Sequence, residues 1–190
     1  MTEPSDKTLA VAERIAQAAR ELGLETAVIG AIALAVHGYP RATEDLDLAI
    51  YTDPFTTLRE LSNKLDALGF HAELRLPDAE DPLGGVLTVT GDDFDTIQLI
   101  NYCNPLTGGD NPGYAAIAAS EGLVPGTSLR VANLAHLVAL KLYAGGVKSK
   151  LDVVELLGRN PEAPRSDVRE VCARYGLGEA FDALLTELEP

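Results

Sequence analysis

Residues 28–50, VIGAIALAVHGYPRATEDLDLAI, decide how the rest of the chain is interpreted. The stretch begins with a strand-like run that ends at Gly30 and closes on the strand-like segment DLDLAI at 45–50. Successive side chains of a strand point to opposite faces, so Asp45 and Asp47 share one face and the alternate apolar residues point into a core. Two neighbouring carboxylates repel each other unless a cation lies between them. Because Mg²⁺ prefers oxygen ligands, the pattern predicts a magnesium site.

The stretch also resembles a known family. From Gly30 the chain reads G-x-x-A-x-x-x-H-G-x-P-R-x-T-x-D-x-D-L, which resembles the glycine motif and acidic strand of the nucleotidyltransferase superfamily that includes DNA polymerase beta. The small bacterial members, the minimal nucleotidyltransferases and the abortive-infection toxin type, are most similar, and the resemblance extends to residues 137–157. It implies a nucleotidyltransferase-like mixed sheet flanked by helices, with a helical C-terminal part.

Length and charge limit the classes of function. The chain has 190 residues, 46% of them hydrophobic, and a formal net charge of −14 at pH 7. This length predicts one compact domain with a helical appendage. The acidic balance disfavours nonspecific binding to nucleic acid, which needs clustered lysine and arginine. It does not exclude a small nucleotide that arrives with its own metal ion.

The sequence carries no feature that directs it to a membrane. No apolar run approaches the roughly 20 residues of a membrane span, and the N-terminal MTEPSDKTLA lacks the basic and apolar regions of a signal peptide. Cys103 and Cys172 lack metal-type spacing, so we expect buried thiols in a reducing cytoplasm.

Periodicity predicts a mixed α/β (α+β) fold. Helices are expected over residues 6–22, 31–37, about 54–68, 114–120, 134–144, 149–157, 166–175 and 178–188. Strands are expected over residues 25–30, 46–51, 71–76, 86–90, 94–102 and 128–131. We therefore divide the chain into an α/β core over 1–131 and a helical region over 132–190 that packs on it.

The resemblance implies roles for four residues around the phosphates. In the family, carboxylates matching Asp45 and Asp47 hold Mg²⁺ (or Mn²⁺) and the phosphates of a nucleoside triphosphate. Gly30 matches the glycine that lets the backbone approach the triphosphate. Ala31 stands where the family has glycine or serine, so it keeps the backbone N–H but lacks a hydroxyl group.

Three further residues are assigned to nucleotide binding with an alternative kept open for each. Arg41 pairs with a phosphate, or instead holds Asp45 or Glu44 in place. Thr43 hydrogen-bonds a phosphate, or instead caps the turn. Lys141 matches a family lysine that faces the phosphates, although a lysine in such an apolar helix also fits the edge of a core.

This sequence differs from the family pattern at the third carboxylate. Active members place it on a neighbouring strand within an apolar-Asp-apolar-apolar pattern, where it acts as general base or second metal ligand. Here the best match, IQLI, puts Gln98 in that place, and glutamine accepts no proton at neutral pH. Asp95 lies three residues earlier, on the opposite face unless a bulge intervenes. Either Asp95 serves through irregular geometry as a catalytic residue, or the site lacks its base.

Two hypotheses about function follow, beside a weaker third, a metal-free structural protein whose aspartates are surface residues. The first is an enzyme that moves a nucleotidyl group from a nucleoside triphosphate to a hydroxyl of a small molecule, a protein or an RNA end. The second is a catalytically degenerate protein of the same fold that binds a nucleotide or a protein partner, as an antitoxin does. A role in a toxin–antitoxin or phage-defence system, with a cognate partner protein, is implied by the resemblance alone.

Overall fold

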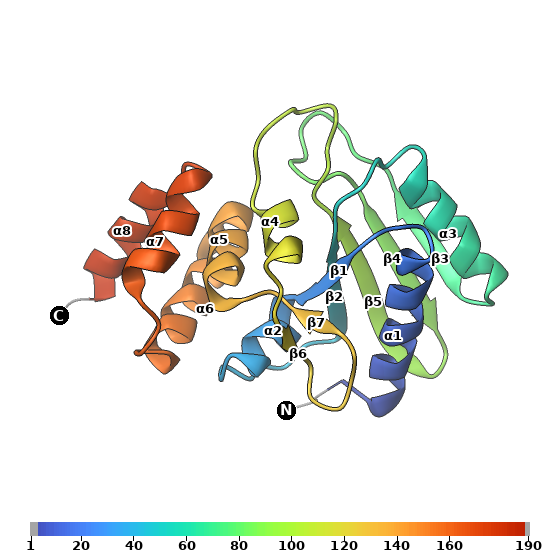
Figure 1. Cartoon of the computed structure of the whole chain (residues 1–190), viewed down its shortest axis with the longest axis horizontal. Coiled ribbons are helices and arrows are strands. Elements are labelled where there is room, and N and C mark those ends of the chain that lie inside the picture. The colour runs from blue at the N-terminus through green and yellow to red at the C-terminus, as the bar shows by residue number, and fades with distance from the viewer. Residues whose placement is uncertain (1–3, 189–190) are drawn as a thin grey trace.

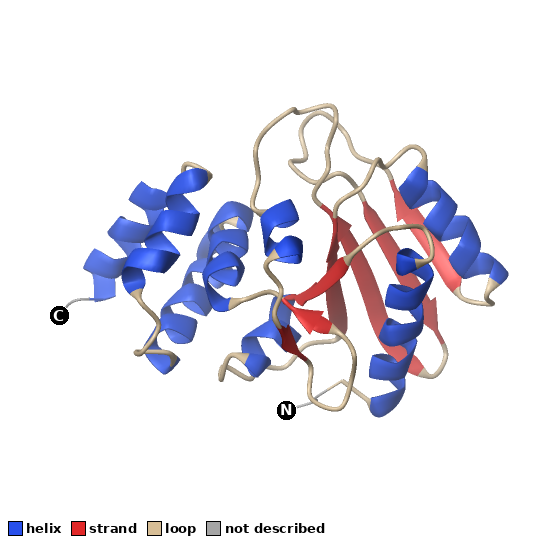
Figure 2. Ribbon diagram, in the orientation of Figure 1, coloured by secondary structure: helices blue, strands red, loops and turns tan. Residues whose placement is uncertain are grey.

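The computed structural model describes residues 4–188, which form one mixed sheet with helices on both sides (Figure 1, Figure 2). The strands are β1 (Thr26–Ile29), β2 (Asp45–Ile50), β3 (His71–Arg75), β4 (Val86–Gly91), β5 (Phe94–Asn101), β6 (Gly122–Leu123) and β7 (Arg130–Val131). The helices are α1 (Asp6–Arg20), α2 (Gly30–Val36), α3 (Thr57–Ala67), α4 (Gly113–Ala118), α5 (Leu134–Ala144), α6 (Gly146–Arg159), α7 (Arg165–Arg174) and α8 (Gly178–Leu188). The mixed α/β fold predicted from the sequence is confirmed.

The acidic strand β2 lies at the centre of the sheet, whose strand order is β3-β4-β5-β2-β1-β7-β6. It pairs antiparallel with β1 and parallel with β5, and β1 in turn pairs parallel with β7. In this register Asp47 lies between Ile29 of β1 and Gln98 of β5. Ile29 and Gln98 are therefore the strand neighbours of Asp47, and Gly30 directly follows Ile29.

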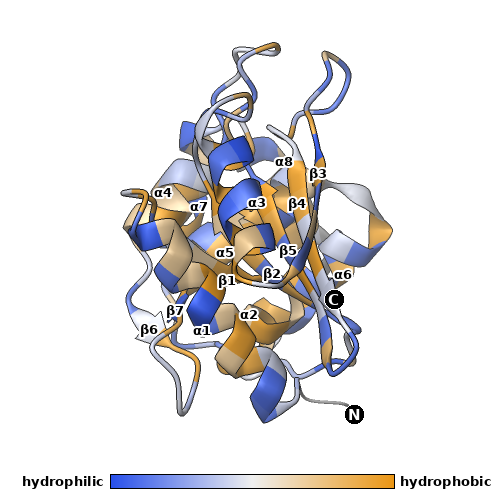
Figure 3. Cartoon of the chain, turned by 90° about the vertical axis from the view of Figure 1, so that its right-hand side faces the viewer, coloured by the Kyte–Doolittle hydropathy of each residue, from blue (hydrophilic) through white to orange (hydrophobic). Residues whose placement is uncertain are grey.

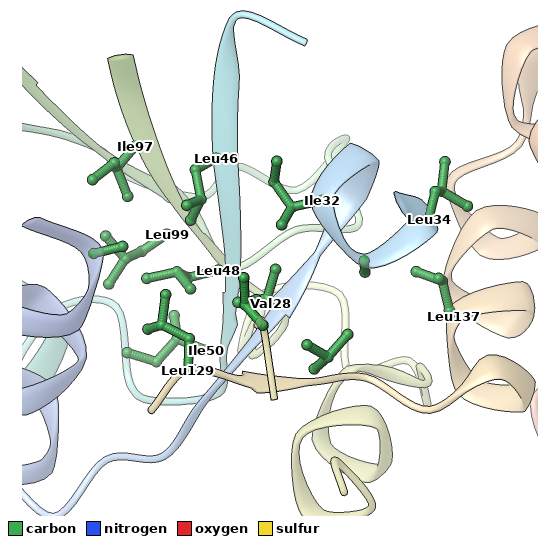
Figure 4. Packing of buried hydrophobic residues seen from close by; sticks show 14 of the residues in the cluster. Val28, Ile32, Leu34, Leu46, Leu48, Ile50, Ile97, Leu99, Leu129 and Leu137 are labelled. Atoms are coloured by element: carbon green, nitrogen blue, oxygen red, sulfur yellow. The ribbon is translucent and has the colours of Figure 1, made fainter. Parts of the chain in front are cut away.

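Apolar residues on one face of the sheet form the main core. Leu46, Leu48 and Ile50 are fully buried there, as the alternation of β2 predicted. They lie beside Ile97 and Leu99 of β5 (Figure 4). Burying such a side chain contributes about 1.5–3 kcal/mol. Helices α1 and α3 cover this face, and colouring by hydropathy shows the strands largely hydrophobic and the connecting loops largely hydrophilic (Figure 3).

Helix α1 begins where its sequence predicts. The Ser5 side chain accepts a hydrogen bond of 3.1 Å from the Thr8 amide, as a capping residue does.

A second, smaller cluster lies on the other face of the sheet, under α4 and α5, and includes Ile29, Tyr102 and Leu140. Helices therefore cover this second face at the β1–β2 side.

The C-terminal helices form the left-hand layer of Figure 1. Asn133 caps α5, and Gly145 and Gly146 adopt φ values of 69° and 78°, which turns the chain between α5 and α6. Helix α6 starts at Gly146, three residues earlier than expected.

The boundary placed at residue 131 falls two residues before the α5 cap, and the division into two parts stays a prediction. None of the helices built from residues 4–188 combines the length and apolarity that spanning a membrane requires.

The short strands β6 and β7 differ from what the sequence predicts. The strand expected over 128–131 is reduced to the two residues of β7, and it pairs with β6, which the sequence did not predict. Both strands are too short for a periodic pattern, so their position depends on the pairing of β7 with β1.

Candidate active site

The two aspartates of β2 share one face of the strand, as predicted. The Asp45 carboxylate accepts a hydrogen bond of 2.6 Å from the Thr43 hydroxyl, which also lies 3.0 Å from the Asp45 backbone oxygen. Thr43 thus fixes the turn into β2 and the orientation of one carboxylate. Of the two alternatives for Thr43, the structure provides the contact for the local one.

Gly30 and Asp47 are in direct contact at the start of α2. Gly30 has a φ of 65°, and a Cβ atom on it would lie only 2.0 Å from Oδ2 of Asp47. Glycine is therefore required here for two reasons, because the backbone is left-handed and because the Asp47 carboxylate occupies the place of a side chain. Ala31, the next residue, is buried.

The environment of Asp47 disfavours its negative charge. Burial, as the largest cause, and the neighbouring charge of Asp45 together raise the pKa of Asp47 to about 6. The positive charges of Lys141, Arg41 and Lys148 oppose this shift, which places all three cations in the field of the aspartate pair. A bound cation would relieve the remaining deficit of positive charge.

Arg41 and Lys141 meet on a third carboxylate, that of Asp152 in α6. Lys141 Nζ donates to Asp152 Oδ2 at 2.7 Å, and Arg41 Nε lies 3.3 Å from Asp152 Oδ1. The Asp152 side chain is only 3% exposed, against 14% for Lys141 and 21% for Arg41. Arg41 therefore pairs with the carboxylate of Asp152, and not with that of Asp45 or Glu44. Lys141 is ion-paired with the same carboxylate and does not lie free at the edge of the core.

The Arg41 Nε–H is not aligned for a hydrogen bond to Asp152, although the two charges form an ion pair. Among the side chains of residues 4–186 it is the only fully buried nitrogen or oxygen without a hydrogen-bond partner. Buried polar groups of folded proteins are nearly always hydrogen-bonded. This unpaired donor in the field of Asp47 is therefore suited to an anionic group of a ligand.

Asp95 does not join the aspartate pair, so the structure corrects that expectation. Its Oδ2 accepts a hydrogen bond of 2.8 Å from Thr8 of α1, on the face of the sheet opposite to Asp47. The bulge in this hairpin falls between Val89 and Gly91, and β5 keeps its alternation from Asp95 to Gln98. In the described part of the chain no three acidic, histidine or cysteine side chains are grouped to hold a metal ion.

A row of polar residues extends from Asp47 toward the edge of the sheet. The register pairs Asp47 with Gln98, Gln98 with Thr88 of β4, and Thr88 with Glu73 of β3. Paired residues project from the same side of a sheet. Thr88 is half-buried and Glu73 is exposed. The sequence could not reveal this row, because it depends on the order and register of three strands.

His37 has a structural contact. Its Nε2 lies 2.8 Å from the backbone oxygen of Ala132, at the end of α2. Asp152 is the residue whose importance the sequence signalled least. The sequence offered two signals: an acidic residue on the inner, apolar side of α6, and a match to the second aspartate of the Lys-Asp-x-x-Asp pattern of the family that the sequence resembles, in which Ser149 replaces the first.

The donor set fits a divalent cation and a phosphate chain. Asp45 and Asp47 offer oxygen ligands of the kind that Mg²⁺ prefers. Gly30 leaves no side chain between the backbone and the Asp47 carboxylate. Arg41 supplies an unpaired N–H, and Lys141 uses one of its three donors on Asp152. The chain can therefore hold a metal-bound polyphosphate at this place.

Comparison with solved structures finds the same fold in other proteins. ANT(2'')-Ia, crystallised in complex with adenylyl-2''-tobramycin, aligns with a TM-score of 0.57 and 15% identity over 89% of this chain and 97% of that chain. The solution structure of the antibiotic-resistance factor ANT(2'')-Ia also gives a TM-score of 0.57 and 15% identity, over 96% of this chain and 95% of that one. An antigenic nucleotidyltransferase-like protein from Paracoccidioides brasiliensis aligns with a TM-score of 0.50 and 16% identity, over 97% of this chain and 95% of that one.

No family model matches the sequence, and no curated protein is significantly similar to it. At identities near 15% a structural likeness establishes the fold and not the activity. The chain has the fold of the nucleotidyltransferase superfamily, which confirms the resemblance noted in the sequence.

Proposed function

We propose that this protein is a nucleotidyltransferase that moves a nucleotidyl group from a nucleoside triphosphate to a hydroxyl acceptor, with Mg²⁺ or Mn²⁺ held by Asp45 and Asp47. The observation that carries the proposal is the contact between Gly30 and Asp47, where a Cβ atom would lie 2.0 Å from the carboxylate. This contact brings the glycine turn and the acidic strand together as one cradle. The fold, shared with ANT(2'')-Ia, supports the same reaction class.

Each residue of the site has a role in this proposal. Asp45, fixed by Thr43, and Asp47 hold the metal ion, which when bound neutralises charge on the phosphates. Lys141 and Arg41 direct their remaining N–H groups at the phosphates and stabilise the charge that develops on the leaving pyrophosphate. Gly30 and Ala31 leave room for the phosphate chain at the start of α2.

The acceptor is proposed to approach over the polar row formed by Gln98, Thr88 and Glu73. These residues continue the face of Asp47, and the helices that pack on β3 and β5 are α3 and α1, on the other face. The row offers neutral and acidic groups, which suit a small hydroxyl compound or a protein side chain. With a net charge of −14, a long RNA is the least suitable acceptor, whereas a short RNA end fits.

A second candidate function rests on Gln98. It lies directly beside Asp47 in the register, and glutamine cannot take a proton from an acceptor hydroxyl. The alternative is a catalytically degenerate protein that binds a nucleotide or a partner protein, as an antitoxin does. In either case we place the protein in the cytoplasm, and a toxin–antitoxin or phage-defence context remains part of the proposal.

Titration calorimetry with Mg²⁺ and each nucleoside triphosphate, together with transfer of an α-phosphate label to candidate acceptors, tests the proposal. Asp45→Asn should abolish binding, whereas Asp95→Asn, which removes the same charge from the other face of the sheet, should preserve it. Binding with label transfer establishes the enzyme, and binding without transfer favours the degenerate protein. An absence of binding to every triphosphate would refute the enzyme and the nucleotide-binding form of the alternative, and would leave only a protein that binds a partner.

A further inference from the structure

We propose that Asp152 is a positioning residue, which holds Arg41 and Lys141 at the aspartate pair so that their free N–H groups face the triphosphate. The inference rests on the proposed function, because it assumes that the site takes a polyphosphate. It goes further in assigning a role to a buried acid that itself contacts neither metal nor nucleotide.

The geometry gives Asp152 one oxygen for each cation. Oδ2 accepts from Lys141 Nζ at 2.7 Å, and Oδ1 lies 3.3 Å from Arg41 Nε. The side chain is 3% exposed, so water does not supply an alternative partner. A buried carboxylate between two cations fixes both of them at short range, and each restricts the position of the other.

The three residues come from segments that are distant in sequence. Arg41 lies in the turn before β2, Lys141 in α5 and Asp152 in the second turn of α6. The two glycines between the helices, with φ values of 69° and 78°, reverse the chain so that Lys141 and Asp152 face each other. Asp152 thus joins the C-terminal helices to the strand that carries the aspartate pair.

The cations keep donors for a ligand after Asp152 is satisfied. Lys141 has three N–H groups and forms a single hydrogen bond to the described residues, the one to Asp152. Arg41 makes no hydrogen bond to residues 4–188, and its buried Nε–H has no partner. Arg41, Lys141 and Asp152 together carry a net positive charge, and a divalent metal ion on Asp45 and Asp47 would offset the charge of that pair, so the loaded site would suit a polyphosphate.

A positioning role and a simple charge effect predict opposite results for Asp152→Asn. If Asp152 acted only through its charge, its removal would make the site more positive and Mg²⁺-ATP would bind more tightly. If it positions Arg41 and Lys141, these cations repel each other in the variant and move, and binding weakens. The sign of the change in Kd therefore separates the two roles.

The experiment compares wild-type protein, Asp152→Asn and Glu155→Gln by titration calorimetry with Mg²⁺-ATP, well below each Tm. Glu155 lies on the same helix, is exposed and pairs with Arg159, so its variant removes the same charge away from the site. We expect Kd to rise about tenfold or more in Asp152→Asn, with full stoichiometry, and to stay unchanged in Glu155→Gln. An unchanged or lower Kd in a folded Asp152→Asn would overturn the inference.

A measurement on the wild-type protein covers the case in which Asp152→Asn does not fold. In ¹⁵N NMR spectra, a positioned Arg41 gives an Nε–H signal that exchanges slowly with water and shifts on addition of Mg²⁺-ATP. An Nε–H that exchanges as fast as those of exposed arginines would refute the positioning role. Failure of wild-type protein to bind any triphosphate refutes the proposed function instead, so the two outcomes are distinct.

Discussion

Asp47, which is half-buried, and Asp152, which is buried, are carboxylates in one region of the molecule, and their charges are compensated to different degrees. Asp152 lies 2.7 Å and 3.3 Å from two cations. Asp47 forms no ion pair within the described part of the chain, lies beside Asp45 and has its pKa raised to about 6. The charge of the first carboxylate is compensated by two cations of the protein, whereas that of the second has no ion-pair partner among the described residues.

Asp152 and Asp47 therefore have different effects on the free protein. The ion-paired carboxylate holds the structure together, since it links the C-terminal helices to the central strand. The uncompensated carboxylate of Asp47 destabilises the free protein at neutral pH, and in the proposed function it is a ligand of the metal ion. Charge removal should therefore have opposite effects on stability at the two places.

The largest expected effect is that of Lys141→Met. Loss of the lysine leaves the buried Asp152 with one misaligned partner, and breaking a buried ion pair in this way costs about 3–5 kcal/mol. Denaturant unfolding measures the change in the free energy of unfolding. Lys7→Met is the matched control, because Lys7 pairs with Asp93 on the surface and both side chains are mostly exposed. A loss as small as that of the control would show that the buried pair contributes little.

Gly30→Ala should have the next largest effect. The new Cβ atom would lie 2.0 Å from Asp47 Oδ2 in a backbone with φ of 65°, so we expect a loss of about 2–4 kcal/mol together with loss of Mg²⁺-ATP binding. Gly126→Ala separates the two causes, because Gly126 has φ of 78° but nothing within 4 Å of its added Cβ. If both variants lose the same stability, backbone strain alone accounts for Gly30.

Asp47→Asn should stabilise the free protein at neutral pH. The folded pKa of about 6 lies above the unfolded value near 3.9. The folded state therefore keeps its proton longer, and stability falls as pH rises from about 4 to 6. The variant lacks this dependence, so we expect it to be about 1–3 kcal/mol more stable than wild-type protein at pH 7 and similar at pH 4. Urea unfolding across this pH range would contradict the interpretation if the difference did not change with pH.

The sequence predicted the part of the site that lies within one stretch. Asp45 and Asp47 are related by strand alternation, and Gly30 directly follows β1, which pairs with β2 so that Ile29 lies opposite Asp47. The contact of Asp152 with Arg41 could not be predicted in this way, because it depends on how α6 packs against the turn before β2. β6 and β7 could not be predicted from local patterns either, because strands of two residues are too short to show a periodic pattern.

The fold was predictable where local patterns were long. Amphipathic α1 and the alternation of β2 specify their own buried faces. Strand order is a property of the whole chain, and it decides that Gln98 lies beside Asp47. Alternation alone correctly placed Asp95 on the opposite face, and only the assumption of a bulge would have brought it to the site.

The smallest expected effect tests this placement of Asp95. The buried Thr8 hydroxyl donates to Asp95 Oδ2 at 2.8 Å, and the Asp95 amide donates to the same hydroxyl at 3.0 Å. Thr8→Val keeps the side-chain shape and removes both bonds, so we expect a loss of about 1–2 kcal/mol in the free energy of unfolding. Because this contact lies on the α1 face of the sheet, the Kd for Mg²⁺-ATP should not change. A weaker Kd in Thr8→Val, measured by titration calorimetry on folded protein, would return Asp95 to the neighbourhood of Asp47 and remove the contrast between the two faces.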